Sequence, residues 1–363
     1  MAGPTTRAQA SWAVHRATSL SEIWAIVAEH LGLVGAWQLM LVCRAACAGA
    51  KEFLGTLPGL VVCGGVTEVD TAVSEVWRLD LASMQWEPMS ALITARFDHA
   101  CCAVRGALVV LGGATSFYRD DIISSVETLS EGQGTFTASP PLSCGGIMEA
   151  ATVVVEESHS AAGLVLVLGG WMEIDRTVSA VHLVDLATGV CTPQPNLLGA
   201  RSLFAAARMP DGCVVCVGGI GDSDEYVAMQ SVEVLEPPEQ GTPDAAWTWR
   251  ALPALSAGRY GCMGCVLSDG RFAVLGGAND NYQPLSSCEA LAVGDGEHWK
   301  LMAPMHDSRV NFAGAAMAGC IVVAGGQGLK SAEVFDEVLD RWLRLPYDIP
   351  LDGGLCFMGS TLL

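Results

Sequence analysis

The chain has 363 residues, of which 51% are hydrophobic and only 16% are charged, and its 19 Lys and Arg against 39 Asp and Glu give a formal net charge of −20. This composition excludes a disordered chain, which would be poor in hydrophobic residues and rich in charge. The acidity also argues against nucleic acids and anionic membranes as partners, because both are bound by clustered Lys and Arg. Glycine, at 41 residues, exceeds its usual share of about 7% and predicts a fold that needs glycine repeatedly.

We expect residues 1–17 to be a disordered lead, since they lack the apolar core of a secretory signal. The absence of any acidic residue before Glu22 leaves a transit peptide as the alternative. No apolar run approaches the ~20 residues of a membrane helix. Without a secretory signal the 14 cysteines are predicted to be reduced thiols, in a protein of the cytoplasm with the nucleus open as a second location.

Residues 18–56 have a helical pattern. Ser21 is a candidate N-cap, the apolar stripe that follows ends near Gly32, and a second helical stretch runs from Trp37 to Phe53. The segment resembles a shortened F-box, with apolar residues where that family's pattern places them: Leu20, Ile23, Ile26, Leu31, Leu39 and Val42, followed by Cys43 and Arg44. The resemblance implies that these apolar side chains bind a Skp-type adaptor, because such short helices cannot bury their apolar faces alone. The alternative is a helical cap packed under the rest of the chain.

Residues 57–363 contain a repeat. Apolar runs that end in Gly-Gly recur six times, and their first glycines are Gly64, Gly112, Gly169, Gly218, Gly276 and Gly325. These glycines are 48, 57, 49, 58 and 49 residues apart, which is the period of a four-stranded propeller blade.

Each unit has the same order of expected strands. A strand rich in Ala, Gly and Cys (99–104 is an example) precedes the Gly-Gly strand, and a variable loop leads to a third, alternating strand. A fourth strand carries an aromatic residue in most units: Trp86, Phe136, Trp247 or Trp249, Trp299 and Trp342, with Cys191 in the third unit. Small residues suit the crowded axis of a propeller, Gly-Gly permits unusual backbone conformations, and large aromatics fill the wedge between blades.

This pattern resembles the Kelch repeat, and the resemblance covers roughly residues 57–363. It implies a mainly β fold, a six-bladed Kelch-type β-propeller. The first unit lacks a small-residue strand, whereas residues 354–363 supply an apolar strand with no Gly-Gly strand after it. We therefore expect the C-terminal strand to complete the first blade and close the ring.

Metal, cofactor and catalytic sites are not expected. The CxxC pairs Cys213/Cys216 and Cys262/Cys265 lie in strand-like segments, where residues i and i+3 point to opposite faces and cannot easily bind one metal. The copper oxidases with Kelch-type repeats need paired Tyr and His ligands, and no such pair is visible here. The His residues considered are His99, His182, His298 and His306. A propeller enzyme stays as the third function class.

Two sets of loops are expected on one face of the propeller. The loops between second and third strands mix carboxylates with Tyr118, Trp171, Tyr226 and Tyr282. The inter-blade loops carry Arg96, Arg201, Arg259 and Arg309, while two junctions have Gly145-Gly146 and Gly353-Gly354 instead. These eight side chains are the candidate partner-binding face, with aromatics and arginines as hot spots. The alternative for the arginines is structural, in that each binds backbone carbonyls and ties blades together.

The sequence thus predicts a non-enzymatic protein-interaction module. By resemblance it would be a substrate receptor of a cullin-type (SCF) ubiquitin ligase, with an adaptor on the helices and a basic or neutral substrate on the propeller. A Kelch scaffold or cytoskeleton-associated protein without a ligase role is the second hypothesis.

Overall fold

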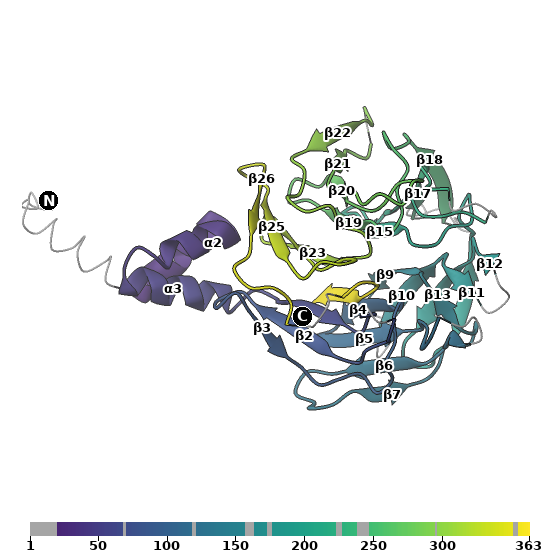
Figure 1. The fold of residues 1–363 in the computed structure, drawn as a ribbon, viewed down its shortest axis with the longest axis horizontal. Helices are drawn as coiled ribbons and strands as arrows, with labels where there is room; N and C mark the ends of the chain where they lie inside the picture. Colours follow the sequence, from purple (N-terminus) through teal and green to yellow (C-terminus); the bar gives the residue numbers. More distant parts are fainter. Residues whose placement is uncertain are drawn as a thin grey trace, which may run out of the picture.

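The structure is a computed structural model that describes residues 20–67, 70–117, 121–156, 163–172, 176–222, 227–237, 247–294, 296–350 and 355–363. The lead expected at residues 1–17 lies outside these ranges. In the described part of the chain, two helices precede a ring of β-sheets (Figure 1). Within the described residues, no helix combines the length and the hydrophobicity required to cross a bilayer.

The N-terminal segment forms α2 (Ser21–Leu39) and α3 (Arg44–Leu54). The N-cap of α2 is Leu20, which makes no side-chain cap hydrogen bond, so the prediction of Ser21 as N-cap was wrong by one residue. Gly32 interrupts α2 with a φ of 70°, as the expected helix end near this glycine indicated. The Sγ of Cys43 accepts a hydrogen bond from the Ala46 amide at 3.4 Å and caps α3.

The helices lie at the outer rim of the ring beside the first and last blades, away from its centre (Figure 1). Leu33 and Ala36 are completely buried in a core that also contains Leu79 of the first blade and Cys320 of the last. The Trp37 indole donates a hydrogen bond to the Leu81 carbonyl at 2.7 Å. One face of the helices is therefore fixed to the propeller by apolar packing.

Six four-stranded antiparallel sheets form the blades, and the strand order confirms the six-bladed propeller. The blades are, in order: β27 (Gly359–Leu362), β1 (Leu60–Cys63), β2 (Val76–Asp80) and β3 (Gln85–Pro88); β4 (Ala100–Val104), β5 (Ala107–Leu111), β6 (Val126–Leu129) and β7 (Thr137–Ser139); β9 (Ala151–Glu156), β10 (Leu164–Leu168), β13 (Val181–Asp185) and β14 (Cys191–Gln194); β15 (Ala205–Arg208), β16 (Val214–Val217), β17 (Val232–Glu236) and β18 (Thr248–Leu252); β19 (Met263–Val266), β20 (Phe272–Leu275), β21 (Cys288–Leu291) and β22 (Trp299–Met302); β23 (Ala313–Met317), β24 (Cys320–Ala324), β25 (Ala332–Asp336) and β26 (Arg341–Arg344).

The C-terminal strand completes the first blade. β27 pairs antiparallel with β1, in a register that places Leu362 opposite Leu60 and Gly359 opposite Cys63. The predicted closure by the end of the chain is confirmed. A small additional sheet of β8 (Ile147–Met148), β11 (Trp171–Met172) and β12 (Arg176–Thr177), which the sequence pattern did not predict, lies beside the third blade.

Each pair of neighbouring blades shares an apolar core, because successive residues of a strand face opposite sides. In β16, Cys216 packs with the third blade and Val215 with the fifth. The same alternation separates the cysteines of each CxxC motif: Cys213 and Cys216 contact different cores. Burial raises the pKa of the Cys262 thiol to about 11, consistent with a cysteine that acts as a small apolar side chain.

The Gly-Gly pairs end the second strands in a backbone conformation with positive φ, which residues with a Cβ rarely adopt. In the fourth blade, Gly218 and Gly219 have φ values of 68° and 98°. A Cβ on Gly218 would lie 2.4 Å from the Arg259 carbonyl oxygen of the next blade. The excess of glycine therefore reflects close contact between blades as well as backbone conformation.

The fourth-strand tryptophans join consecutive blades. The Trp249 indole donates to the Pro195 carbonyl at 2.8 Å, and Trp299 donates to Pro253 at the same distance. Trp342 donates to Ala303 at 2.9 Å. Because Trp249 pairs with Leu235 in the same register as Trp299 with Leu291, Trp249 rather than Trp247 is the repeat residue.

Candidate functional site

A closed ring of six backbone hydrogen bonds surrounds the propeller axis. Each inner strand is preceded by one residue in the left-handed conformation, with φ between 51° and 59°. The amide of each of these residues donates to the carbonyl of the preceding one, at 2.7 to 3.2 Å. The axial ring, as we call it, consists of Asp98, Glu149, Leu203, Gly261, Asn311 and Phe357. It orients one side-chain position per blade toward the mouth of the propeller.

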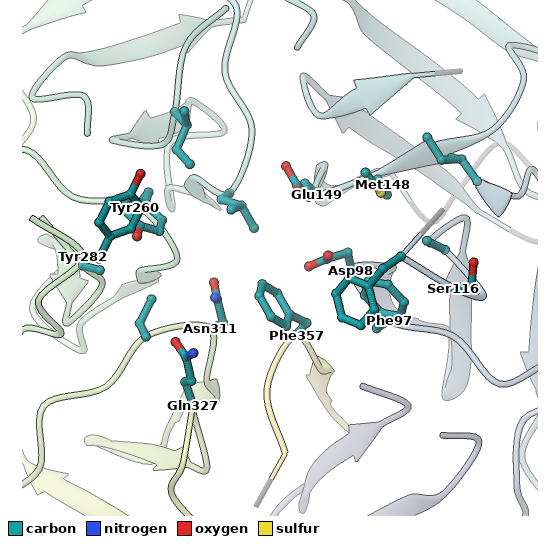
Figure 2. A pocket seen from close by; sticks show the side chains of 17 residues that line it. Phe97, Asp98, Ser116, Met148, Glu149, Tyr260, Tyr282, Asn311, Gln327 and Phe357 are labelled. Atoms are coloured by element: carbon teal, nitrogen blue, oxygen red, sulfur yellow. The ribbon is translucent and has the colours of Figure 1, made fainter. Parts of the chain in front are cut away.

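A pocket of about 430 Å³ lies over the axial ring (Figure 2). Its lining comes from both expected sets of loops, the inter-blade loops and the loops after the Gly-Gly pairs. Besides five axial-ring residues, the lining includes Phe97, Ala114, Ser116, Phe117, Ile122, Met148, Ile220, Tyr260, Ala278, Tyr282, Val310 and Gln327. The described part of this lining contains two carboxylates and no Lys, Arg or His.

The two carboxylates belong to Asp98 and Glu149, which are neighbours in the axial ring and half-buried. Both side chains point into the cavity (Figure 2). Burial raises the pKa of Asp98 well above its usual value, and the nearby charge of Glu149 raises it further. Burial also raises the pKa of Glu149, although a hydrogen bond from Ser202 opposes the shift. A positive charge placed between them would favour the ionised forms.

Aromatic rings flank Asp98. The ring centroids of Phe97 and Phe117 are 4.6 Å apart, and those of Phe97 and Phe357 are 6.4 Å apart. Tyr260 and Tyr282 lie on the opposite side of the cavity (Figure 2). The pocket therefore combines apolar walls with a few convergent polar groups, as ligand-binding pockets do.

The four inter-blade arginines do not contact the pocket. Arg96, Arg201, Arg259 and Arg309 are at most 1% exposed, so their assignment to the partner-binding face was wrong and the structural alternative holds. Arg259, as an example, donates to the carbonyls of Gly276 at 2.9 Å and Ser287 at 3.0 Å, and its guanidinium lies 2.8 Å from the Glu289 carboxylate.

The same arrangement occurs in the other three blades that have the arginine. The ion pairs are Arg96–Glu127, Arg201–Glu233 and Arg309–Glu333. The arginine carbonyl in turn accepts from the second glycine of the preceding blade, for example Gly219 to Arg259 at 2.9 Å. Each arginine thus ties two blades together. At the two junctions with glycine pairs, Ile147 and Leu355 occupy the arginine position, and Gly353-Gly354 lie outside the described residues.

Of the four predicted aromatic residues, Tyr282 lines the pocket and is 63% exposed. Trp171 lies in β11 and is not part of the lining. Tyr118 and Tyr226 lie outside the described residues. Sequence reasoning missed the axial ring, although a signal exists: each of its residues lies two positions after the arginine or its substitute.

The predicted adaptor-binding residues are mostly exposed. Six large apolar side chains between residues 20 and 42 are 38 to 89% exposed: Leu20, Ile23, Ile26, Leu31, Leu41 and Val42. Leu39 differs, since it is 8% exposed and belongs to the core shared with the propeller, so it cannot contribute to an adaptor surface in this conformation. The helices thus have one face on the blades and an apolar face in solvent.

The histidines considered as ligands have local structural contacts. His306 donates to the Glu333 carboxylate at 2.7 Å, and the His99 Nε2 lies 3.4 Å from the Sγ of Cys63. His298 donates to the Gly296 carbonyl at 2.6 Å. Across the described ranges, no three His, Cys, Asp or Glu side chains gather as metal ligands would.

The fold and this site define a class: a six-bladed Kelch-type propeller with an axial pocket and an N-terminal helical segment, typical of protein-interaction modules. No family model matches the chain. Comparison with curated proteins finds similarity to F-box/kelch-repeat proteins. It is 27% identical over 255 residues to F-box/kelch-repeat protein SKIP30 of Arabidopsis thaliana, a match that covers 67% of this chain and 61% of that protein.

A second relative, F-box/kelch-repeat protein At1g16250 of the same organism, is 43% identical over 56 residues, or 14% of this chain and 15% of that protein. The resemblance to F-box/kelch-repeat proteins is thereby confirmed, while the chain matches less than two thirds of the length of either relative. Among solved structures, that of YjhT aligns with a TM-score of 0.61 over 80% of this chain and 98% of that one. At 13% identity this likeness concerns the fold alone.

Proposed function

We propose that the protein is a substrate receptor of a cullin-type (SCF) ubiquitin ligase. The helices α2 and α3 bind a Skp-type adaptor, and the mouth of the propeller binds the target. The chain itself catalyses no reaction and acts in the cytoplasm, with the nucleus as a second compartment.

The exposed apolar face of the helices is the observation that carries this proposal. Ile26 and Leu31 are 57% and 55% exposed, although Ala28 and Leu33 of the same helix are completely buried in a core shared with α3 and the blades. A helix that served only as a cap would need no apolar residues on its outer face. An adaptor that covers this face would remove them from water, and the names of both F-box/kelch relatives agree with this function.

Two surfaces are needed for a receptor, and the chain has two. The axial pocket is lined by axial-ring residues and so lies at the centre of the propeller. The helices lie at the rim of the ring (Figure 1). An adaptor on the helices therefore leaves the mouth accessible to a target. The rigid core between the helices and the first and last blades would hold the two bound proteins in a fixed geometry.

The test is retention of a purified Skp-type adaptor by the full chain. We expect the unsubstituted chain to retain the adaptor, and Ile26→Glu with Leu31→Glu to reduce the affinity about tenfold or more, because both substitutions put a charge into an apolar contact. Both side chains are exposed, so the fold should persist. Leu301→Glu is the matched control, since Leu301 is a 72%-exposed apolar residue of β22 on the propeller.

Failure of the folded, unsubstituted chain to retain the adaptor would overturn the ligase role. An equal loss with Leu301→Glu would show that the helices are not the binding surface. Either result would favour the second function, a Kelch scaffold whose N-terminal helices only cover the edge of the propeller core. The buried side of the helices, with Leu33 and Ala36 completely enclosed, supports that alternative.

A further inference from the structure

The axial pocket contains two carboxyl groups and, among the described residues that line it, no basic side chain. The four arginines next to the mouth are each paired with a glutamate, so these ion pairs contribute no net charge. Asp98 and Glu149 have no such cation within the described lining. Half-buried carboxylates without a nearby cation destabilise the folded state, and such groups occur chiefly at functional sites.

The backbone fixes where these two carboxylates can reach. The Glu149 amide donates to the Asp98 carbonyl at 2.8 Å, so the two residues occupy adjacent positions of the axial ring. Their side chains point into the same space, with Asn311 nearby (Figure 2). A group at the axis would therefore meet both carboxylates at once.

The rest of the lining suits an elongated, partly apolar group. Phe97 and Phe357 flank Asp98, with Tyr260 across the cavity (Figure 2). Aromatic faces attract ammonium and guanidinium ions as well as methylene groups. A lysine or arginine side chain has both parts, an apolar stem and a charged end. A carboxylate or phosphate in the same place would be repelled by Asp98 and Glu149.

We propose that the axial pocket receives one lysine or arginine side chain from the segment of the target protein bound at the mouth. The charged end lies between Asp98 and Glu149, and the stem contacts the aromatic walls. This inference rests on the proposed function of the propeller as the target-binding part. It adds a chemical requirement, a basic residue at the centre of the bound segment.

The volume is consistent with this occupant. A cavity of about 430 Å³ is far larger than a bare metal ion requires, and it falls within the range of pockets that enclose organic groups. The axial-ring carbonyls already accept hydrogen bonds from neighbouring amides, and the remaining polar groups are spread around the wall. An extended cation that touches several walls fits this distribution better than a compact one.

The experiment uses three small probes with the full chain: Nα-acetyl-lysine methylamide, its arginine analogue and its norleucine analogue, which has no charge on a stem of similar length. Ligand-observed NMR titration should give dissociation constants on the order of 1 mM for the two basic probes, as expected for such small ligands. Norleucine should bind at least about tenfold more weakly, because it lacks the charge.

Asp98→Asn and Glu149→Gln should each weaken the basic probes about tenfold and leave norleucine unchanged. Glu87→Gln is the matched control, since Glu87 is an exposed carboxylate of β3 outside the pocket lining, and it should have no effect. Both pocket substitutions replace a half-buried carboxyl group by an amide of the same shape, so the folded state should tolerate them.

Three results would overturn the inference: no binding of either basic probe at about 10 mM, equal binding of norleucine, or unchanged affinity in Asp98→Asn with Glu149→Gln. These results would not affect adaptor retention by the helices, which is measured separately. Conversely, a chain that binds the basic probes but retains no adaptor would keep the pocket's specificity and lose the ligase role.

Discussion

The buried ion pairs behind the mouth predict a large effect from a single conservative substitution. Glu289→Gln keeps the shape and one acceptor oxygen of the side chain but removes its charge. Arg259, 1% exposed, would then keep its bonds to the Gly276 and Ser287 carbonyls and lose the carboxylate 2.8 Å away. The result is a positive charge enclosed by protein without a counter-ion.

Removing one partner of a buried pair costs about 3–5 kcal/mol, and the remaining hydrogen bonds of Arg259 place the expected loss near 3 kcal/mol. For a chain of this length about 2 °C of melting temperature corresponds to 1 kcal/mol, so we expect a decrease of about 6 °C. Glu297→Gln is the control. Glu297 pairs with Arg250 at 3.0 Å, but Arg250 is 43% exposed, so this exposed pair should contribute less than about 1 kcal/mol.

Thermal unfolding of the two variants, followed by near-UV circular dichroism, makes the comparison. Similar decreases for Glu289→Gln and Glu297→Gln would refute the argument, because burial would then not determine the cost. A double-mutant cycle with Arg259→Met adds a second check. The Arg259–Glu289 coupling should be about 2 kcal/mol, since the double variant leaves no unpaired charge.

Two other substitutions and one truncation test the fold and the site. Gly218→Ala should destabilise the chain more than Gly270→Ala. Both glycines have positive φ, but only at Gly218 would a Cβ meet a backbone atom, the Arg259 carbonyl oxygen, at 2.4 Å. Equal unfolding midpoints of the two variants in urea would contradict this. Removal of residues 359–363 should abolish the cooperative unfolding transition, because β1 would lose its partner β27, and a truncated chain with an unchanged midpoint would show that closure is dispensable. Asp98→Asn should stabilise the chain by about 0.5–2 kcal/mol at pH 7. Because the folded-state pKa of Asp98 is raised, the protonated carboxyl group stabilises the fold fully below the unfolded pKa of about 3.9, and this stabilisation is lost as the pH rises through the folded-state pKa. The stability advantage of Asp98→Asn should therefore vanish near pH 4. An advantage in melting temperature that does not change with pH would refute the Asp98 charge as the cause.

The fold could be predicted from the sequence because its determinants are local and repeated. Six Gly-Gly pairs at similar spacing identify six second strands, and the composition of residues 354–363 identifies the missing inner strand of the first blade. Each of these signals depends on one steric requirement, such as the positive φ of Gly218. Repetition made the requirement visible without knowledge of tertiary contacts.

The candidate site was harder to predict because the relevant residues do not repeat. Asp98, Leu203 and Phe357 share a backbone conformation but no side-chain chemistry, and three-dimensional closure brings them together. The arginines gave the opposite problem. The inter-blade arginine occurs in four of the blades, and it is repeated because it makes a structural bond, such as that of Arg309 to Glu333, rather than a contact with a partner. The Ser-x-Glu sequence at the start of the third strand accompanies the arginine in each of the four blades that have it, which would have indicated the structural role.

The axial ring has a consequence for how the specificity of this protein can change. Its amides and carbonyls form hydrogen bonds with one another around the axis, so these backbone groups are already engaged and contribute little to the binding of a ligand. Selectivity at the centre must therefore come from the side chains at the axial-ring positions, five of which carry one and the sixth of which is Gly261. Since the same backbone already accommodates Leu203, Gly261 and Phe357, a new target class could be acquired by exchanging residues at these positions, with every blade left in place.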